Sequence, residues 1–374
     1  MRLRNLLAAA VAGACIAGAV AWAIPATAGG PGPGDVAPSA VAAFPHIDHV
    51  FVIMMENTAY DDLLSPSNAN TPFIRSIAST YGLDTNYFGV THVSLPNYLA
   101  ATSGSNWGSN SDDVNQAPYF DHENIVDQFE QAGISWKAYM ENLPAAGDTI
   151  AQTPDHLYVR KHDPFLMYPD VFNDPARANK VVPLSQLTTD LSTNTVPQFV
   201  WISPNQCNDM HGGATGCPFA NAPGDANQQA LYQDGNDFLQ TWVTAIMNSK
   251  AWTGHSAIFV TWDEGSFADD APFGPNDISG CCDSPYLPSP PANPVTGGGG
   301  DLAATATTPA ATLYGGGHVP MIVIERNGPR GVTVSTATNH YSLLQTIEQN
   351  WNLPYLGNAS DTRQVHSLAP LIRP

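Results

Sequence analysis

Three apolar segments of the chain each run directly into polar side chains that could bind a metal ion. These side chains are Glu56 and Asn57 after segment 50–55, Asp263 and Glu264 after segment 257–262, and Asn205, Asn208, Asp209 and His211 after segment 197–203. The carboxyl ends of strands meet at one edge of an open α/β sheet, so we expect the three clusters to converge. The adjacent carboxylates of Asp263 and Glu264 would repel each other unless a cation lies between them. Each cluster alone also fits an ordinary strand end, but together they predict a site for Mg²⁺, Mn²⁺, Ca²⁺ or Zn²⁺.

Ser94 lies where a helix is expected to begin. Pro96 is tolerated in the first turn of a helix, and the residues 99–102 that follow favour helix. One interpretation is that Ser94 is an ordinary N-cap. The other is that the free N–H groups of the helix start attract a phosphate and that a divalent cation lowers the hydroxyl pKa, which would make Ser94 a phosphoryl acceptor. These residues alone support both interpretations equally.

Three histidines have neighbours that indicate a functional role. His211 follows Asp209 at a strand end and is a candidate for metal or phosphate contact. His162 lies in the segment 160–165 (RKHDPF), which is one of the few basic places in the chain and so indicates a phosphate contact. His340 precedes the last expected helix and either caps it or lines the site. The remaining histidines considered structural or exposed are His46, His49, His122, His156, His255 and His366.

Strand-like and helix-like segments alternate along the chain, which predicts a layered α/β fold. Continuous apolar runs of the kind that fill doubly buried strands occur at 49–55, 257–262 and 319–325, with further strands expected at 134–140 and 197–203. Helices are expected at 71–81, 123–132, 234–249 and 341–351. These helices and strands must carry the polar clusters to one edge of the sheet.

The first 28 residues have the pattern of a signal peptide. Arg2 and Arg4 precede the apolar run 6–24, and Ala26-Thr27-Ala28 supplies the small residues of a cleavage site. A Gly/Pro/Ala-rich linker (29–45) follows, with no basic stop-transfer cluster. We therefore expect a protein secreted to the exterior or the cell envelope, with no stable membrane anchor and with one main domain at 46–374. A transmembrane anchor or a lipid on Cys15 fits less well.

The chain is strongly acidic, with 33 Asp and Glu against 13 Lys and Arg and a net charge of −20. This charge argues against nucleic acid and against an anionic membrane surface as partners, and it favours binding of cations. Nothing in the composition indicates the oligomeric state.

Four cysteines follow the predicted signal peptide, which indicates two disulfides in an oxidising compartment. Cys207 and Cys217 would close a short loop, and we expect them to pair. Cys281 and Cys282 would then form a vicinal disulfide; the alternative is that they form disulfides with Cys207 and Cys217. They lie in a Gly/Pro-rich stretch, 266–315, which we expect to be an insertion loop.

Eight segments carry a family resemblance, and they occur in order. They are MMENTAYDDLL (54–64), THVSLPNYLAATSG (91–104), WKAYMENLP (136–144), RKHDPF (160–165), ISPNQCNDMHGG (202–213), VTWDEG (260–265), GGHVPMIVI (316–324) and NHYSLLQTIEQNWNLP (339–354). The chain resembles the phosphoesterase family of secreted acid phosphatases and, more distantly, bacterial phospholipases C. The resemblance implies an alkaline-phosphatase-like, three-layer α/β/α sandwich. It also implies that Ser94 is both nucleophile and metal ligand, that the other metal ligands are Glu56, Asn57, Asp263 and Glu264, and that the phosphate site is lined by Asn97, His162, Asp209 and His211.

The chain departs from the phospholipase-like members at one place. Those members carry an Asp-His pair shortly after the TWDE motif, whereas residues 267–272 here read FADDAP and contain no histidine. We therefore expect an acid phosphatase that hydrolyses small phosphomonoesters or phosphoinositides through a phosphoseryl intermediate on Ser94. His211 or His162 would move the proton, and His340 would help to bind substrate. The alternatives are a phospholipase C or phosphodiesterase acting on phospholipid headgroups, and an inactive secreted binding protein on the same scaffold.

Overall fold

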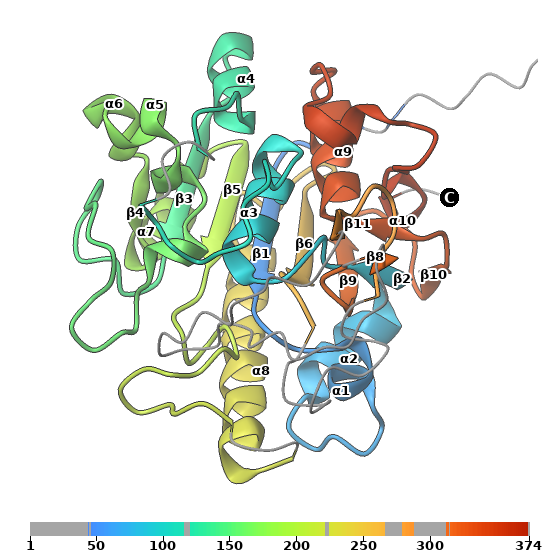
Figure 1. The fold of residues 1–374 in the computed structure, drawn as a ribbon. Helices are drawn as coiled ribbons and strands as arrows, with labels where there is room; N and C mark the ends of the chain where they lie inside the picture. The colour runs from blue at the N-terminus through green and yellow to red at the C-terminus, as the bar shows by residue number, and fades with distance from the viewer. Residues whose placement is uncertain are drawn as a thin grey trace, which may run out of the picture. The chain divides into compact units, whose positions relative to one another are not determined.

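The computed structural model describes residues 44, 46–115, 120–220, 224–265, 279–287, 312–313 and 315–372. The predicted signal peptide at 1–28, all of the linker except Phe44, and most of the predicted insertion at 266–315 lie outside these residues. The described part of the chain forms the expected three-layer α/β/α sandwich, with one large sheet between two layers of helices (Figure 1).

The large sheet has nine strands in the order β10-β2-β9-β6-β1-β5-β3-β4, with β11 also pairing with β2. The strands are β1 (Val50–Met55), β2 (Gly82–Phe88), β3 (Trp136–Met140), β4 (Val181–Pro183), β5 (Phe199–Ser203), β6 (Ala257–Trp262), β9 (His318–Glu325), β10 (Val332–Val334) and β11 (Thr338–Asn339). Strand β9 is antiparallel to both of its neighbours, and the other pairings in this sheet are parallel. Every residue of β1, β5 and β6 is buried, as expected for central strands covered on both faces. A separate small sheet pairs β7 (Tyr286–Leu287) with β8 (Thr312–Leu313).

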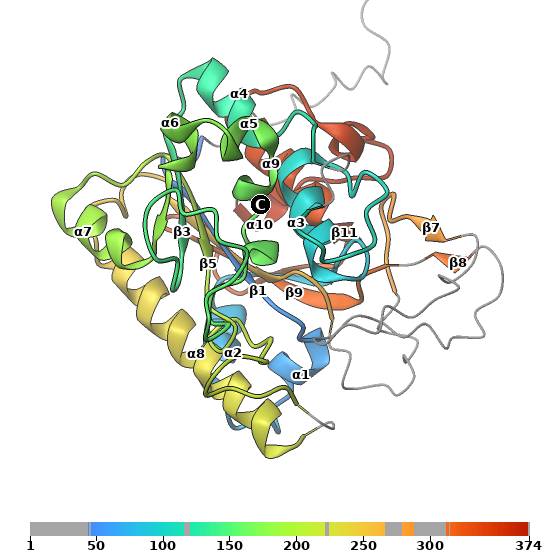
Figure 2. The same cartoon turned by 60° about the vertical axis from the view of Figure 1, so that its left-hand side comes forward.

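Two pairs of helices cover opposite faces of the large sheet (Figure 2). On one face α2 (Pro72–Thr80) packs against α8 (Ala226–Met247), and the side-chain oxygen Oδ1 of Asn236 accepts the N–H of Phe73 at 2.8 Å. On the other face α3 (Ser94–Ser103) packs against α9 (His340–Asn350). The remaining helices are α1 (Tyr60–Leu64), α4 (Ile125–Ala132), α5 (Pro169–Phe172), α6 (Pro175–Ala178), α7 (Ser185–Thr193) and α10 (Ala369–Ile372).

The expected helices and strands are present, with two instructive differences. Helix α8 begins at residue 226 rather than 234, because Asp225 accepts the N–H of Gln228 and caps a first turn whose residues are mostly polar. Strand β2 is not indicated by the sequence pattern. It begins at Gly82, directly after the predicted helix 71–81, and its mixed polar sequence GLDTNYF lacks a strand-like apolar run.

Helix α9 carries a buried carboxyl away from the polar clusters. Glu348 accepts the N–H of Leu356 at Oε1, 2.7 Å away, while its Oε2 has no hydrogen-bond partner among the described residues. Burial raises the pKa of Glu348 to about 9. Because this pKa is higher in the folded protein than in the unfolded chain, the carboxyl destabilises the fold increasingly as the pH rises from about 4.3 towards 9.

Glu348→Gln should therefore become more stable relative to the wild type as the pH rises. The free energy of unfolding of the variant minus that of the wild type should increase by at most about 1.4 kcal/mol per pH unit in this window. Thermal unfolding at pH 5 and pH 8 measures the change. Glu123→Gln, the same substitution at an exposed position, is the control. A stability difference for Glu348→Gln that is the same at both pH values would contradict the prediction.

Candidate active site

The polar clusters meet at the carboxyl ends of the three adjacent central strands, as expected. Strands β6, β1 and β5 are neighbours in the sheet, so the residues that follow them lie side by side. The backbone N–H of Asn57, after β1, donates to Oδ1 of Asp263, after β6, at 3.1 Å. On the other side the N–H of Glu56 donates to the carbonyl of Asp209 at 2.8 Å. Parallel strand order thus brings together residues up to about two hundred positions apart in the chain.

Ser94 is the first residue of α3, and its side chain does not cap the helix. The N-cap is Val93, and the Ser94 hydroxyl donates instead to Oε2 of Glu56 at 3.0 Å. Ser94 is 1% exposed. The interpretation of Ser94 as an ordinary N-cap is therefore wrong, because its hydroxyl is directed to the carboxylates at the strand ends.

Asn97 and Tyr98, one turn further along α3, hold the surroundings of Ser94. Asn97 accepts the N–H groups of Val90 and Thr91 at 2.9 and 3.0 Å, and its amide donates to the Thr91 carbonyl at 2.7 Å. The amide also lies 3.4 Å from Oε2 of Glu264. Asn97 thus shapes the turn that precedes Ser94, and a direct contact with substrate stays a prediction. Tyr98 donates its hydroxyl hydrogen to Oε1 of Glu56 at 2.6 Å and so orients that carboxylate.

The oxygen atoms around Ser94 fit a divalent cation. Glu56, Asp209, Asp263 and Glu264 are all buried. Oδ1 of Asn57, Oδ2 of Asp263 and Oε1 of Glu264 have no hydrogen-bond partner among the described residues. A buried oxygen without a partner is costly, and several such oxygens together are the ligand set that hard divalent cations prefer. The four predicted ligands and Ser94 thus have a donor chemistry that suits a metal ion.

Burial and mutual repulsion raise the pKa of these carboxyls. Burial raises the pKa of Glu56 well above its usual value, and the charges of Asp263 and Asp209 add to the effect. Burial raises the pKa of Asp263 to about 7, and burial together with the charge of Asp263 raises that of Glu264. A cation among them would restore their ionised forms.

His162 and His211 lie beside the carboxylates, with their ring centroids 5.2 Å apart in an edge-to-face arrangement. Nδ1 of His162 pairs with Oδ2 of Asp209 at 3.1 Å, and its Nε2 lies 3.1 Å from Oε1 of Glu56. His211 donates from Nδ1 to the carbonyl of Gly212 at 2.9 Å. Burial lowers the pKa of both histidines, that of His211 to about 3, so both rings are neutral. Glu56, His162 and His211 each offer a ligand atom within 4.8 Å of the others, which is a second arrangement able to bind a metal ion.

His340 is fully buried at the start of α9. Its Nε2 lies 2.5 Å from the carbonyl oxygen of Asp263, and its Nδ1 lies 2.9 Å from the hydroxyl of Tyr87. Both ring nitrogens therefore have protein partners, which gives His340 a positioning role for Asp263. The predicted contact with substrate is a separate matter and stays a prediction.

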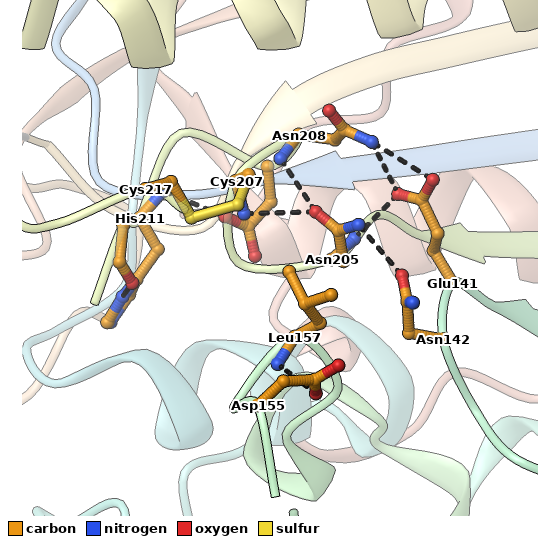
Figure 3. Close-up of a disulfide and its surroundings, with 11 residues drawn as sticks. Glu141, Asn142, Asp155, Leu157, Asn205, Cys207, Asn208, His211 and Cys217 are labelled. Atoms are coloured by element: carbon orange, nitrogen blue, oxygen red, sulfur yellow. Dashed lines mark hydrogen bonds between the residues drawn. A yellow bond between two sulfur atoms is a disulfide. The ribbon is translucent and has the colours of Figure 1, made fainter. Parts of the chain in front are cut away.

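Asn205 and Asn208 do not belong to the metal ligands that the strand-end pattern indicated. Glu141, which follows β3, accepts the backbone N–H of Asn205 at 2.9 Å. Its two carboxylate oxygens also accept from the side-chain amide of Asn208, at 3.0 and 2.9 Å (Figure 3). The two asparagines instead fold the loop that carries Asp209 and His211. Strand-end position alone could not separate these two roles.

The four cysteines after the predicted signal peptide form two disulfides. Cys207 and Cys217 are bonded as expected and close the loop around His211 (Figure 3). Cys281 and Cys282 form the vicinal pair. The amide of Asn339, the N-cap of α9, donates to both of their carbonyl oxygens at 3.1 Å. The first disulfide thus braces the loop of the site, and the second contacts Asn339, the residue that precedes His340.

Four residues of the site were not singled out from the sequence. Nδ1 of His92 lies 2.7 Å from Oε2 of Glu264, and the hydroxyl of Tyr98 donates to Glu56 as described above. Both lie in the segment around Ser94, and Tyr98 is four positions further along the helix, which places it on the same face. Lys161 and Asp112 form an ion pair with 2.7 Å between Nζ and Oδ2. Burial opposes the charge on Lys161, but Asp112 and Glu56 outweigh it and raise the pKa of the ammonium.

No helix in the described ranges is long and apolar enough to cross a membrane.

Known proteins similar to this chain include several phosphatases. The chain is 25% identical over 312 residues to an acid phosphatase of Aspergillus fumigatus, which covers 82% of this chain and 55% of that protein. It therefore spans little more than half the length of this relative. It is 28% identical over 324 residues to a phosphatidylinositol-3-phosphatase of Mycobacterium tuberculosis, which covers 86% of this chain and 83% of that protein. Among solved structures, a protein of the alkaline phosphatase superfamily from Vibrio parahaemolyticus matches with a TM-score of 0.49 and 10% identity, over 83% of this chain and 67% of that chain.

A sequence profile of the phosphoesterase family matches residues 63–354, which is more than three quarters of the chain and includes Ser94, the loop with Asp209 and His211, and the Asp263–Glu264 pair. The resemblance inferred from the eight ordered segments is confirmed, and the chain belongs to the phosphoesterase family.

Proposed function

We propose that this chain is a metal-dependent phosphomonoesterase of the acid phosphatase type that uses Ser94 as its nucleophile. The observation that carries the proposal is the buried hydroxyl of Ser94, which lies at the start of α3 and donates to Glu56. Three side-chain oxygens nearby have no hydrogen-bond partner among the residues that the structure describes. The similarity to acid phosphatases supports the reaction class.

The residues of the site fit a two-step displacement. A divalent cation held by Glu56, Asn57, Asp263 and Glu264 would polarise the phosphoryl group and lower the pKa of the Ser94 hydroxyl. Ser94 Oγ attacks phosphorus in line and expels the alcohol, which leaves a phosphoseryl ester. The proton of the hydroxyl has a path along its hydrogen bond to Glu56 and on to Nε2 of His162, 3.1 Å from Oε1 of Glu56.

Water then hydrolyses the phosphoseryl ester, with His162 or His211 moving the proton. Asp209 fixes the ring of His162 through Nδ1, so Nε2 is directed to Glu56, 3.1 Å from its Oε1. Burial lowers the pKa of both histidines and so keeps both rings neutral before the reaction. The first N–H groups of α3 favour the negative charge of the phosphoryl group at this position.

The substrate in this proposal is a small phosphomonoester or a phosphoinositide. The similarity to a phosphatidylinositol-3-phosphatase over most of both chains supports the phosphoinositide class. We further propose a secreted protein whose signal peptide (1–28) is removed, with a linker at 29–45, a catalytic domain at 46–374 that contains the insertion 266–315, and no nucleic acid partner. The acidic composition and the pattern of the first 28 residues support these statements.

Acid quenching during turnover tests the nucleophile. With p-nitrophenyl phosphate in excess and divalent metal present, we expect a phosphorylated enzyme whose modified peptide carries phosphoserine at position 94. The absence of any phosphoenzyme under rapid quenching, or its location on another residue, would contradict the proposal.

A phospholipase C or phosphodiesterase is the second candidate, because the phosphoesterase family includes phospholipases C. The sequence FADDAP at 267–272 lacks the histidine of those members, which favours monoesters. Comparing turnover of p-nitrophenyl phosphate, bis-p-nitrophenyl phosphate and phosphatidylcholine separates the candidates. An inactive binding protein, the third alternative, would turn over none of these with any divalent ion.

A further inference from the structure

One lysine lies at the edge of the site and has no role in the displacement described above. Nζ of Lys161 lies 2.7 Å from Oδ2 of Asp112 and 3.1 Å from Nε2 of His211. Because His211 donates from Nδ1 to Gly212, its Nε2 accepts from the ammonium. These two contacts use two of the three N–H bonds of Lys161.

The carboxylate of Asp112 binds two groups that would also bind a phosphate. Its Oδ2 accepts from Lys161, and its Oδ1 accepts the backbone N–H of Leu95 at 3.0 Å. Leu95 is the second residue of α3 and follows Ser94 directly. An oxyanion held by an ammonium and by a helix N-terminal N–H, next to the nucleophile, has the environment of the transferred phosphoryl group.

Asp112 adds a carboxylate to a site that already contains several buried carboxyl groups. The charge of Asp112 is among the causes that raise the pKa of the buried Glu264, so it adds to the repulsion in the site. Asp112 and Lys161 also line a cavity of about 370 Å³, together with His211, Gln152 and the partly exposed ring of Phe219. A substrate that enters through this cavity meets the ion pair at the boundary of the site.

We propose that Lys161 binds the phosphoryl group of the substrate, and that Asp112 occupies this position in the resting protein and is displaced when substrate binds. The inference rests on the proposed function and adds a substrate-binding residue and a competing internal anion to it. A purely structural ion pair has a different consequence, because removing either partner would then disturb the site in the same direction.

Binding of inorganic phosphate to the metal-supplemented protein tests the inference by calorimetry, alongside KM and kcat for p-nitrophenyl phosphate. Lys161→Met should weaken phosphate binding by about 10-fold or more and raise KM, because a charged hydrogen bond to the anion is lost. Asp112→Asn retains an acceptor for Leu95 but frees the ammonium, so it should tighten phosphate binding by about 5-fold. Lys161→Arg should recover part of the lost affinity.

Asp113→Asn is the matched control. Asp113 lines the same cavity and loses the same charge on substitution, but its carboxylate is exposed and accepts the N–H of Asn115. It should change phosphate binding by less than about 2-fold. Wild-type phosphate affinity in Lys161→Met, or weaker binding in Asp112→Asn as well, would overturn the inference. Phosphoserine at position 94 is measured separately, so failure of this inference and failure of the proposed nucleophile give different results.

Discussion

Ser94→Ala should reduce kcat for p-nitrophenyl phosphate by about 10⁴-fold or more while leaving the fold intact. The reason is that the proposed phosphoseryl ester cannot form without Oγ, and loss of a nucleophile removes most of the rate enhancement of such enzymes. The hydroxyl donates to Glu56 and also lies close to the carboxyl groups of Asp263 and Glu264. Its loss should cost about 1 kcal/mol of stability, which leaves the protein folded. Steady-state kinetics at saturating divalent metal, together with thermal unfolding of the same samples, measure both effects.

Ser103→Ala is the control for this variant. Ser103 is the last residue of the same helix, is also fully buried, and donates its hydroxyl hydrogen to the carbonyl of Leu99 at 2.8 Å. Its substitution removes this bond, and also the hydrogen bond that its oxygen accepts from Nε1 of Trp107 at 2.9 Å, at the other end of α3. It should therefore lower stability at least as much as Ser94→Ala and leave kcat within a few-fold of the wild type. Wild-type turnover by Ser94→Ala, or an equal loss in Ser103→Ala, would show that Ser94 is not the nucleophile.

The sequence was sufficient to predict the meeting of Glu56, Asn57, Asp263 and Glu264, for a simple physical reason. Each pair follows a continuous apolar run, and such runs form parallel strands whose carboxyl ends share one edge of a sheet. The sequence did not indicate that β1 and β6 are direct neighbours in the sheet. This knowledge was not needed, because the carboxyl ends of all parallel strands lie at the same edge.

The local geometry around Ser94 could not be predicted in the same way. Proline at the third position and the residues after it indicated the helix, but they fit a capping serine and a nucleophile equally well. Only the contact with Glu56, 38 positions earlier in the chain, distinguishes the two interpretations. The prediction that Asn205 and Asn208 belong to the metal site was wrong for a related reason. Both donate to Glu141, which follows a different strand, β3.

Lys161 and Asp112 show the limit of sequence patterns most clearly. They lie 49 positions apart, Asp112 in the loop after α3 and Lys161 in the 3₁₀ turn Arg160–His162, and neither belongs to a strand end. Asp112 carries no local signal that would separate it from the neighbouring Asp113. Their pairing results from how the loop after α3 folds over the site, which no hydrophobic pattern encodes.

Chelation of divalent metal ions should abolish turnover and lower the melting temperature, with a larger decrease at pH 7.5 than at pH 5. Without a cation, the buried carboxyls of Glu56, Asp209, Asp263 and Glu264 have a pKa above that of the unfolded chain, about 7 for Asp263. The folded protein then holds more protons than the unfolded chain between about pH 4 and 7, so its stability falls as the pH rises through this range. A bound cation removes that cost and adds its own binding free energy to the folded state.

Mg²⁺, Mn²⁺, Ca²⁺ and Zn²⁺ are then added separately to the chelated protein. The ion that restores turnover should also restore the melting temperature. Asp263→Asn is the informative variant, because it retains the size of the side chain but removes one ligand charge and the repulsion on Glu264. It should therefore be more stable than the wild type in the chelated state at pH 7.5, yet gain less from added metal. A chelated wild-type protein with unchanged turnover would exclude a metal role in catalysis. Unchanged stability on refilling, with Asp263→Asn behaving as the wild type, would show that the oxygens around Ser94 do not bind a cation.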